Sequence, residues 1–322
     1  MRLRVVPDET SFDFFRRWKL WLGISGAAVV IAFVSFLMQG LNYGIDFQGG
    51  TTIRTESPRP VDVAEFRAAL DPLALGDITI SEVFDPTFDD DQNVAMIRIQ
   101  AQTGEEAIDS ATVAAVQEAL RAIRPDITFG AVESVGPKVS AELIRTAALA
   151  VLLSMAAVLV YIWLRFEWQF AVGAVLALVH DVVLTIGIFS EFQIRFDLAT
   201  IAALLTIVGY SLNDTVVIFD RVRENLIKYK KMPLKDVLNL AINETLSRTF
   251  MTSFTTLLAL FALLALGGDV IRGFVFAITW GVVVGTYSTI FVATAALLWL
   301  GVKRDWDPAE DTGAGTRFGT DA

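Results

Sequence analysis

One polar pair interrupts an otherwise apolar stretch in VGYSLNDTVVIFDRVREN, residues Val208 to Asn225. Asn213 and Asp214 stand about six residues, or ~9 Å of helix rise, from the charged run that begins at Asp220. An ionised side chain near the centre of a bilayer costs at least ~2.5 kcal/mol on insertion scales. Apolar surroundings favour the neutral form of a carboxyl, so Asp214 can hold and release a proton. We therefore take Asp214 as a candidate proton carrier.

Arg248 is the predicted counter-charge of Asp214. It begins the next apolar segment from its charged side, and its long stem can reach inward from there. Tyr210 and Ser211 precede Asp214 by four and three residues, so on a helix they share its face and suit a polar path. The predicted proton relay comprises Asp214, Arg248 and Asn213. The alternative is a static polar cluster that holds helices together.

His180 and Asp181 form a second polar pair within an apolar segment, and His180 is the only histidine of the chain. Histidine titrates closest to physiological pH, whereas an interhelical hydrogen bond is the common role of polar residues in a bundle. Both readings stay open, and both residues are treated as accessory, with Tyr210 and Ser211. The chain has no cysteine and no nucleophile–base or metal triad. We expect no catalytic residue, no metal site and no enzyme activity.

The elements that carry these residues are membrane spans. Hydrophobic residues make up 54% of the 322 residues, and the mean hydropathy is +0.55. Crossing about 30 Å of hydrocarbon takes at least ~17 residues. Six segments are near or above that length, which predicts a polytopic α-helical membrane protein: 20–45, 142–164, 169–190, 196–219, 249–267 and 273–301. The net charge of −10 argues against nucleic acid as a partner.

Lysine and arginine predict the orientation of these spans. Residues 1–19 hold five of them, residues 220–248 seven and residues 303–322 three, against one each in 191–197 and 268–272. The positive-inside rule then places both termini in the cytoplasm. The 220–248 connection is a predicted amphipathic cytoplasmic loop, and 303–322 has the composition of a disordered tail. The first span has no A-x-A-like cleavage site and an apolar stretch too long for a signal peptide, so we expect an anchor.

Residues 46–141 have the pattern of a small exported domain. Strands are predicted at 51–57, 77–84, 94–100 and 126–135, with helices at 61–70 and 104–123. The order β-α-β-β-α-β is that of the ferredoxin-like α+β arrangement. One helix, an exported domain and five further helices make up the layout of half of a transporter of the resistance-nodulation-division (RND) type.

A glycine-rich motif, YGIDFQGGTTI, follows the first span, and Gly44, Gly49 and Gly50 surround Asp46 in it. Glycine tolerates positive φ, so this motif is a candidate hinge. Four later stretches follow in order: VESVGPKVSAEL, ALVHDVVLTIGIF, VGYSLNDTVVIFDRVREN and LSRTFMTSFTTLLAL. Together the five motifs resemble the SecF members of the SecD/SecF protein-export family, within the RND superfamily. The resemblance runs from about Arg17 to Leu300.

The resemblance implies a function and partners. It implies a multi-pass protein of the bacterial inner membrane that helps to complete protein export, driven by the proton-motive force without a bound cofactor. SecD is the implied obligate partner, followed by the SecYEG channel, YajC and YidC, a translocating polypeptide and membrane lipid. The family residues implicated in proton use match Asp214 and Arg248, which favours the relay over the static cluster. The alternative functions are half of an RND-type proton-driven exporter of small molecules or lipids, and a structural organiser that moves no protons.

Overall fold

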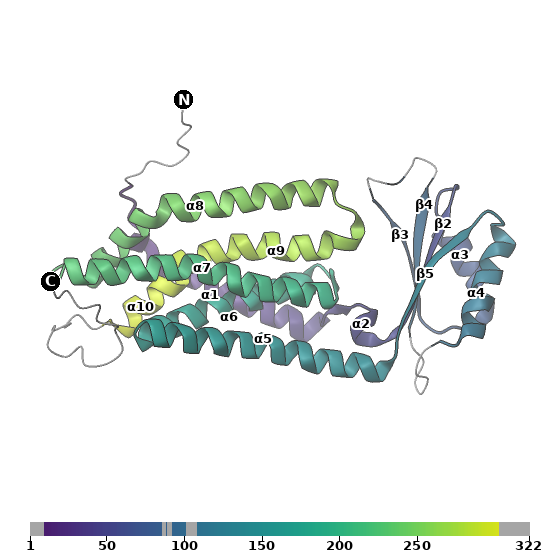
Figure 1. Ribbon diagram of the computed structural model, residues 1–322, viewed down its shortest axis with the longest axis horizontal. Helices are drawn as coiled ribbons and strands as arrows, with labels where there is room; N and C mark the ends of the chain where they lie inside the picture. Colours follow the sequence, from purple (N-terminus) through teal and green to yellow (C-terminus); the bar gives the residue numbers. More distant parts are fainter. Residues whose placement is uncertain (1–9, 86–87, 89–91, 101–107, 303–322) are drawn as a thin grey trace, which may run out of the picture.

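The computed structural model describes residues 10–85, 88, 92–100 and 108–302. A bundle of long helices runs along the molecule, and a sheet domain covered by two helices stands at one end of it (Figure 1). Residues 1–9 of the predicted cytoplasmic N-terminus lie outside the described residues, as does the predicted tail 303–322.

Six helical segments of the described chain are long and apolar enough to cross a membrane, as the sequence predicts. The bundle begins with a 3-10 turn η1 (Phe14–Arg17), which leads into α1 (Trp18–Gln39). After the sheet domain come α5 (Pro137–Arg165), α6 (Trp168–Glu191), α7 (Leu198–Lys228) and α8 (Leu234–Leu266). The last span comprises α9 (Asp269–Ser288), a π-helical turn η3 (Thr289–Ala293) and α10 (Thr294–Leu300).

The bundle has inner and outer helices. α6, α7 and α9 are extensively buried, whereas α1, α5 and α8 leave most of their apolar residues exposed. Large exposed side chains on the outer helices include Leu153 and Trp163 on α5 and Leu258 and Phe261 on α8. In a membrane protein such faces contact lipid or other transmembrane helices. The sequence-predicted polar pair of α6 and Asp214 of α7 therefore lie on the best-covered helices.

Several boundaries differ from the sequence-based prediction: α5 begins at Pro137 and α9 at Asp269, where the sequence predicted residues 142 and 273. The first span ends at Gln39 rather than at residue 45, because Gly40 adopts φ +66° and turns the chain. The predicted amphipathic loop 220–248 is also corrected. α7 continues to Lys228 and α8 begins at Leu234, so only a short connection remains. Val237 and Ile242 of this segment do not face the membrane surface, because both are fully buried in a core shared with Phe15.

The exported domain has the predicted ferredoxin-like arrangement. Its elements are β2 (Gly50–Ser57), α3 (Val63–Leu70), β3 (Ile78–Val83), β4 (Asn93–Gln100), α4 (Ser110–Ile123) and β5 (Thr128–Val135). The strand order is β3-β4-β2-β5, and every pair is antiparallel. α3 and α4 cover the side of the sheet away from the bundle (Figure 1). Ile53, Phe66, Ile97, Val116 and Leu120 fill the core between them.

The junction between domain and bundle contains elements that the sequence did not predict. A two-residue strand β1 (Asn42–Tyr43) pairs in parallel with β6 (Arg195–Phe196), which immediately precedes α7. A four-residue helix α2 (Ile45–Gln48) follows β1 and leads into β2. The chain thus reaches the sheet domain only after contacting the start of α7.

Candidate functional site

Asp214 lies inside the bundle, where α7 packs against α8. Its side chain is 3% exposed. Its one hydrogen bond among the described residues comes from Thr252 of α8, whose Oγ1 lies 3.4 Å from Oδ1 of Asp214. The same hydroxyl is 3.0 Å from the carbonyl oxygen of Thr249 and has one proton to share between the two. Asp214 is therefore a buried carboxyl with a single long contact.

Arg248, the predicted counter-charge, lies one helical turn before Thr252 on α8 and is exposed. It borders a polar hollow of about 520 Å³ between the C-terminal part of α7 and the N-terminal part of α8, lined also by Arg165, Asp220, Arg221, Glu224 and Glu244. The other cations of this hollow are paired, Arg165 with Asp220 and Arg221 with Glu224 and Glu244. Within the described chain Arg248 has no ion pair, and no contact within 4.0 Å joins it to Asp214. The Asp214–Arg248 relay stays a prediction.

The other predicted members of the Asp214 site diverge. Asn213 is exposed, about 100° around α7 from the buried Asp214. Tyr210 points to α8, where its hydroxyl donates to Thr256 Oγ1 at 3.2 Å. Ser211 points to α6 instead, where its hydroxyl donates to Asp181 Oδ2 at 2.7 Å. The single polar path predicted along this face therefore divides between two neighbouring helices.

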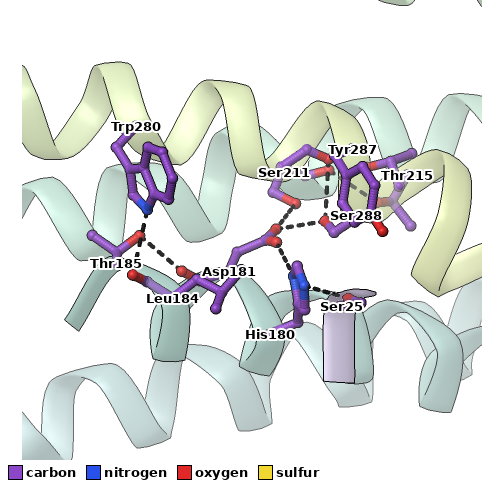
Figure 2. Close-up of polar contacts among 12 residues, drawn as sticks. Ser25, His180, Asp181, Leu184, Thr185, Ser211, Thr215, Trp280, Tyr287 and Ser288 are labelled. Carbon is purple, nitrogen blue, oxygen red and sulfur yellow. Dashed lines mark hydrogen bonds and ion pairs between the residues drawn. The ribbon is translucent and has the colours of Figure 1, made fainter. Parts of the chain in front are cut away.

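The pair His180–Asp181 forms the centre of a buried hydrogen-bond network (Figure 2). Asp181 is fully buried, and its Oδ2 accepts from Ser211 of α7 at 2.7 Å and from Ser288 of α9 at 2.8 Å. Its Oδ1 lies 3.0 Å from Nδ1 of His180. The two hydroxyls and this ring nitrogen are the potential donors to the Asp181 carboxyl. A proton on Nδ1 of His180 completes this set.

His180 extends the network to the first helix. Its Nε2 lies 2.6 Å from Oγ of Ser25, so Ser25, His180 and Asp181 form a chain of hydrogen bonds from α1 into the bundle (Figure 2). In the tautomer that carries its proton on Nδ1, His180 accepts a hydrogen bond from the Ser25 hydroxyl at Nε2. Tyr287 stacks on the imidazole and donates to the carbonyl oxygen of Trp21 at 2.7 Å. The network therefore joins α1, α6, α7 and α9.

α9 packs closely enough against α6 and α7 for its side chains to take part in this network. A Cβ on Gly285 would lie 3.2 Å from Cβ of Ser211 and 3.5 Å from Oδ2 of Asp181. The next turn is π-helical, and its first residue, Thr289, shares a 2.9 Å hydrogen bond with Thr215 of α7. Single π-helical turns are frequent at functional sites. Gly285 belongs to the sequence GVVVG, which is typical of close helix contacts.

Sequence reasoning missed three hydroxyl residues of this network: Ser25, Ser288 and Thr289. Serine and threonine in a transmembrane helix commonly donate to carbonyls of their own helix, so residue type alone gives no sign of an interhelical partner. The available signal was the position of Ser288, one turn after the GVVVG segment. A small-residue face brings such a hydroxyl close to the neighbouring helix.

The predicted hinge residues lie at the junction outside the bundle. Gly49 and Gly50 adopt φ +75° and +139°. Gly44 has an extended backbone and packs against Arg195 and Asp197. The Asp46 carboxylate accepts a hydrogen bond from the backbone amide of the first residue of α7. None of these observations measures movement, so the hinge stays a prediction.

Among the residues the structure describes, no cluster of three or more histidine, cysteine or acidic side chains has the geometry of a metal site. The arrangement instead places two carboxyls with different surroundings between membrane-spanning helices, with a folded sheet domain at one end of the bundle. This is the architecture of half of an RND-type membrane transporter.

The comparisons with known proteins agree with this class. The model of the family "Protein export membrane protein SecD/SecF, C-terminal" matches residues 115–303, and that of the SecD/SecF GG motif matches residues 34–57. The protein translocase subunit SecF of Cereibacter sphaeroides is 60% identical over 317 residues, covering 98% of each chain. The chain therefore belongs to the SecD/SecF family of protein-export membrane proteins.

Fused relatives show how such a chain relates to a larger protein. The protein translocase subunit SecDF of Brucella abortus is 41% identical over 303 residues, which cover 94% of this chain and 39% of that protein. The crystal structure of SecDF from Thermus thermophilus, a translocon-associated membrane protein, has a TM-score of 0.81 at 34% identity. The match covers 93% of this chain and 40% of that one. In these relatives the region like this chain is covalently joined to a SecD region.

Proposed function

We propose that this chain is the proton-using half of an export complex in the inner membrane, with both described ends of the helical bundle in the cytoplasm. A separate SecD chain takes the place of the SecD region of the fused relatives. The full assembly acts late in export, on a polypeptide that emerges on the outer side from a SecYEG channel. YajC and YidC are further proposed partners. The energy source is the proton gradient, and no bound cofactor is required.

The observation that carries this proposal is the environment of Asp214. A carboxyl that is 3% exposed and receives one 3.4 Å hydrogen bond is poorly stabilised as an anion. Arg248, which has no ion pair among the described residues, borders the polar hollow at the cytoplasmic end of the same two helices. Approach of Arg248 to an ionised Asp214 would compensate the charge, and protonation of Asp214 would remove the attraction. α7 and α8 thus have two arrangements, one with Asp214 ionised and close to Arg248 and one with Asp214 protonated.

The test is the substitution Asp214→Asn, which keeps the size of the side chain but removes its titration. We expect the chain to insert, to bind its SecD partner and to lose gradient-dependent export, because no proton can leave position 214. The measurement follows late release of a secreted protein from sealed vesicles, with the gradient present or collapsed.

The matched control is Asp220→Asn, on the same helix but half-exposed and paired with Arg165. It should retain the response to the gradient. An Asp214→Asn complex that responds to the gradient as the wild-type complex does would rule out Asp214 as the proton carrier.

A further inference from the structure

The glycine-rich motif after α1 is fastened to the start of α7. Asn42 and Tyr43 pair in parallel with Arg195 and Phe196, and the amide of Gly44 donates to the carbonyl oxygen of Phe196 at 2.8 Å. The motif thus lies against the residues that lead into α7, although more than 150 positions separate the two in sequence. These contacts fasten the start of the motif to the residues that lead into α7.

Asp46 makes the most specific of these contacts. Its Oδ2 accepts a hydrogen bond from the backbone amide of Leu198, the first residue of α7, at 3.1 Å. The amides of the first turn of a helix have no partner within the helix. Asp197, the N-cap residue, accepts from the amide of Thr200 at 3.0 Å. Asp46 therefore satisfies an amide that the helix's own cap leaves open, and it places a second negative charge at the positive end of α7.

The glycines of the motif leave room for the contact between Asp46 and the Leu198 amide. A Cβ at Gly44 would lie 3.1 Å from Nε of Arg195 and 3.2 Å from Cβ of Asp197, which is tighter than ordinary contact. Gly49 ends α2 with φ +75°, and Gly50 begins β2 with φ +139°. Residues with a Cβ rarely adopt these conformations. Together the glycines permit close approach on one side of Asp46 and a sharp turn into the sheet on the other.

Charge at the junction links Asp46 to the sheet domain as well. Arg98 of β4 shares this site with Arg195, Asp197 and Asp46: burial and the neighbouring Arg195 lower the pKa of Arg98 to about 10, while Asp197 and Asp46 act in the opposite direction. Arg98 thus remains charged at neutral pH. Arg195 lies 3.8 Å from Asp197, and both arginines contact the sulfur of Met96. Two carboxylates and two guanidinium groups therefore balance where β4 meets α7.

We propose that Asp46 is a positioning residue that couples the exported domain to α7, the helix that carries Asp214. Its acceptor oxygen, rather than its charge, makes the contact to Leu198. A change in the tilt of α7 then moves the start of the sheet domain with it. The role in export rests on the function proposed above, whereas the mechanical coupling is a property of the chain that can be measured separately.

The test uses the absence of native cysteine. Single cysteines introduced at the exposed positions Glu118 on α4 and Ala199 on α7 carry spin labels, and the distance distribution between the labels is measured by pulsed electron paramagnetic resonance in the complex with SecD. We expect a narrow distribution in the wild-type chain and in Asp46→Asn, whose amide oxygen still accepts. The distribution should broaden in Asp46→Ala, and gradient-dependent export should fall with it.

A second variant removes the donor in place of the acceptor. Leu198→Pro deletes the amide that Asp46 binds, at the first helical position, where proline is well tolerated. The preceding Asp197 is extended, with φ −130° and ψ −176°, a conformation compatible with a following proline. Leu198→Pro should broaden the distribution as Asp46→Ala does, and the double variant should be no broader than either. Asp71→Ala, an exposed aspartate of the same domain, is the matched control and should leave the distribution narrow.

The outcomes separate the two proposals. An unchanged distribution in both Asp46→Ala and Leu198→Pro would overturn the coupling, whatever the export measurement gives. Broadening in Asp46→Asn equal to that in Asp46→Ala would overturn the assignment to the acceptor oxygen. Broad distributions without any loss of gradient-dependent export would overturn the role of Asp46 in export. A wild-type complex that shows no gradient dependence would instead contradict the function proposed for Asp214.

Discussion

The bundle contains two buried aspartates with contrasting surroundings. Asp181 accepts from two serine hydroxyls and lies beside the histidine ring, whereas Asp214 has one long contact to a threonine. Donors compensate the desolvation of an anion, and their scarcity favours the neutral acid. Asp181 therefore joins side chains of several helices through hydrogen bonds, whereas Asp214 has few contacts to lose.

Replacing the two aspartates by alanine should separate these roles at the level of stability. Asp181→Ala removes the acceptor of Ser211 and of His180 Nδ1 and leaves Ser288 only the Gly285 carbonyl of its own helix, so we expect a loss of about 1–3 kcal/mol in the free energy of unfolding. Asp214→Ala, the matched variant, should lower it less, because it leaves only Thr252 without that contact and Thr252 also reaches its own helix. Denaturant titration of the purified complex in mixed micelles measures both. A larger loss for Asp214→Ala would contradict the assignment.

Residue type identified both aspartates from the sequence, but not the difference between them. That difference depends on which hydroxyls of other helices point toward each carboxyl, and helix rotation sets this. Ser211 illustrates the problem, because it is three residues from Asp214 yet bonds to Asp181. The helical repeat predicts which face of α7 carries Ser211, but not which neighbouring helix that face contacts.

The first helix is held to the bundle by a small number of close contacts. Three polar bridges run from it, from Ser25 to His180, from Ser35 to Ser190, and from the Trp21 carbonyl to Tyr287. Between them, Gly187 of α6 faces Ala32, whose Cα would lie 2.8 Å from a Cβ at position 187. The backbone of α1 thus approaches α6 closely at this point. The sequence indicated the small-residue face of α9 but not this one, since neither residue four positions from Gly187 is small.

Gly187→Ala should push α1 away from α6. Its Cβ would overlap Ala32, including backbone atoms that cannot turn aside, so we expect a destabilisation of about 1–3 kcal/mol. Gly209→Ala is the control, because nothing lies within 4 Å of a Cβ there and alanine favours the helix. Denaturant titration gives both values. The close contact between α1 and α6 would be refuted if the two substitutions had the same effect.

Element boundaries departed from the sequence for a reason visible in α7 and α8. Charged residues from Asp220 onward predicted the end of a span, but helical hydrogen bonds continue past the hydrocarbon wherever tertiary packing supports them. Leu226 and Val237 pack together in the same core and stabilise these extensions. The exported domain was easier to predict, because its alternating strands and amphipathic helices carry their own periodic pattern.

At the scale of the whole molecule, the exported domain contacts the bundle at a second place. The amide of Phe84, after β3, donates to Asp269 Oδ2 at 2.7 Å, and the amide of Asp269 donates to the carbonyl oxygen of Phe84 at 2.9 Å. Asp269 begins α9, directly after the turn from α8. The domain is therefore tied to α7 through Asp46 and to the α8–α9 turn through Asp269.

Asp269→Ala should loosen this second tie. We expect faster hydrogen–deuterium exchange of the Phe84 amide, because it loses the carboxylate that accepts its proton. Exchange in the buried centre of β4 should stay unchanged, since its ladder bonds to β2 and β3 are intact. Mass spectrometry of the complex, with Asp71→Ala as a surface control, makes the comparison. Unaltered exchange at Phe84 would show that the contact does not persist in the membrane.

α7 has 31 residues, and this length has a mechanical consequence. An unbroken helix of that size is about 46 Å long, compared with about 30 Å for the hydrocarbon of a bilayer. Its N-terminal end carries the contact to Asp46, and its C-terminal part borders the hollow that contains Arg248. Pivoted at one end, such a rod turns a tilt of about 5° into a displacement of about 4 Å at the other. A small movement at one end of α7, such as the approach of two side chains, can thus displace its other end across the membrane. That displacement is comparable to the spacing between neighbouring β-strands.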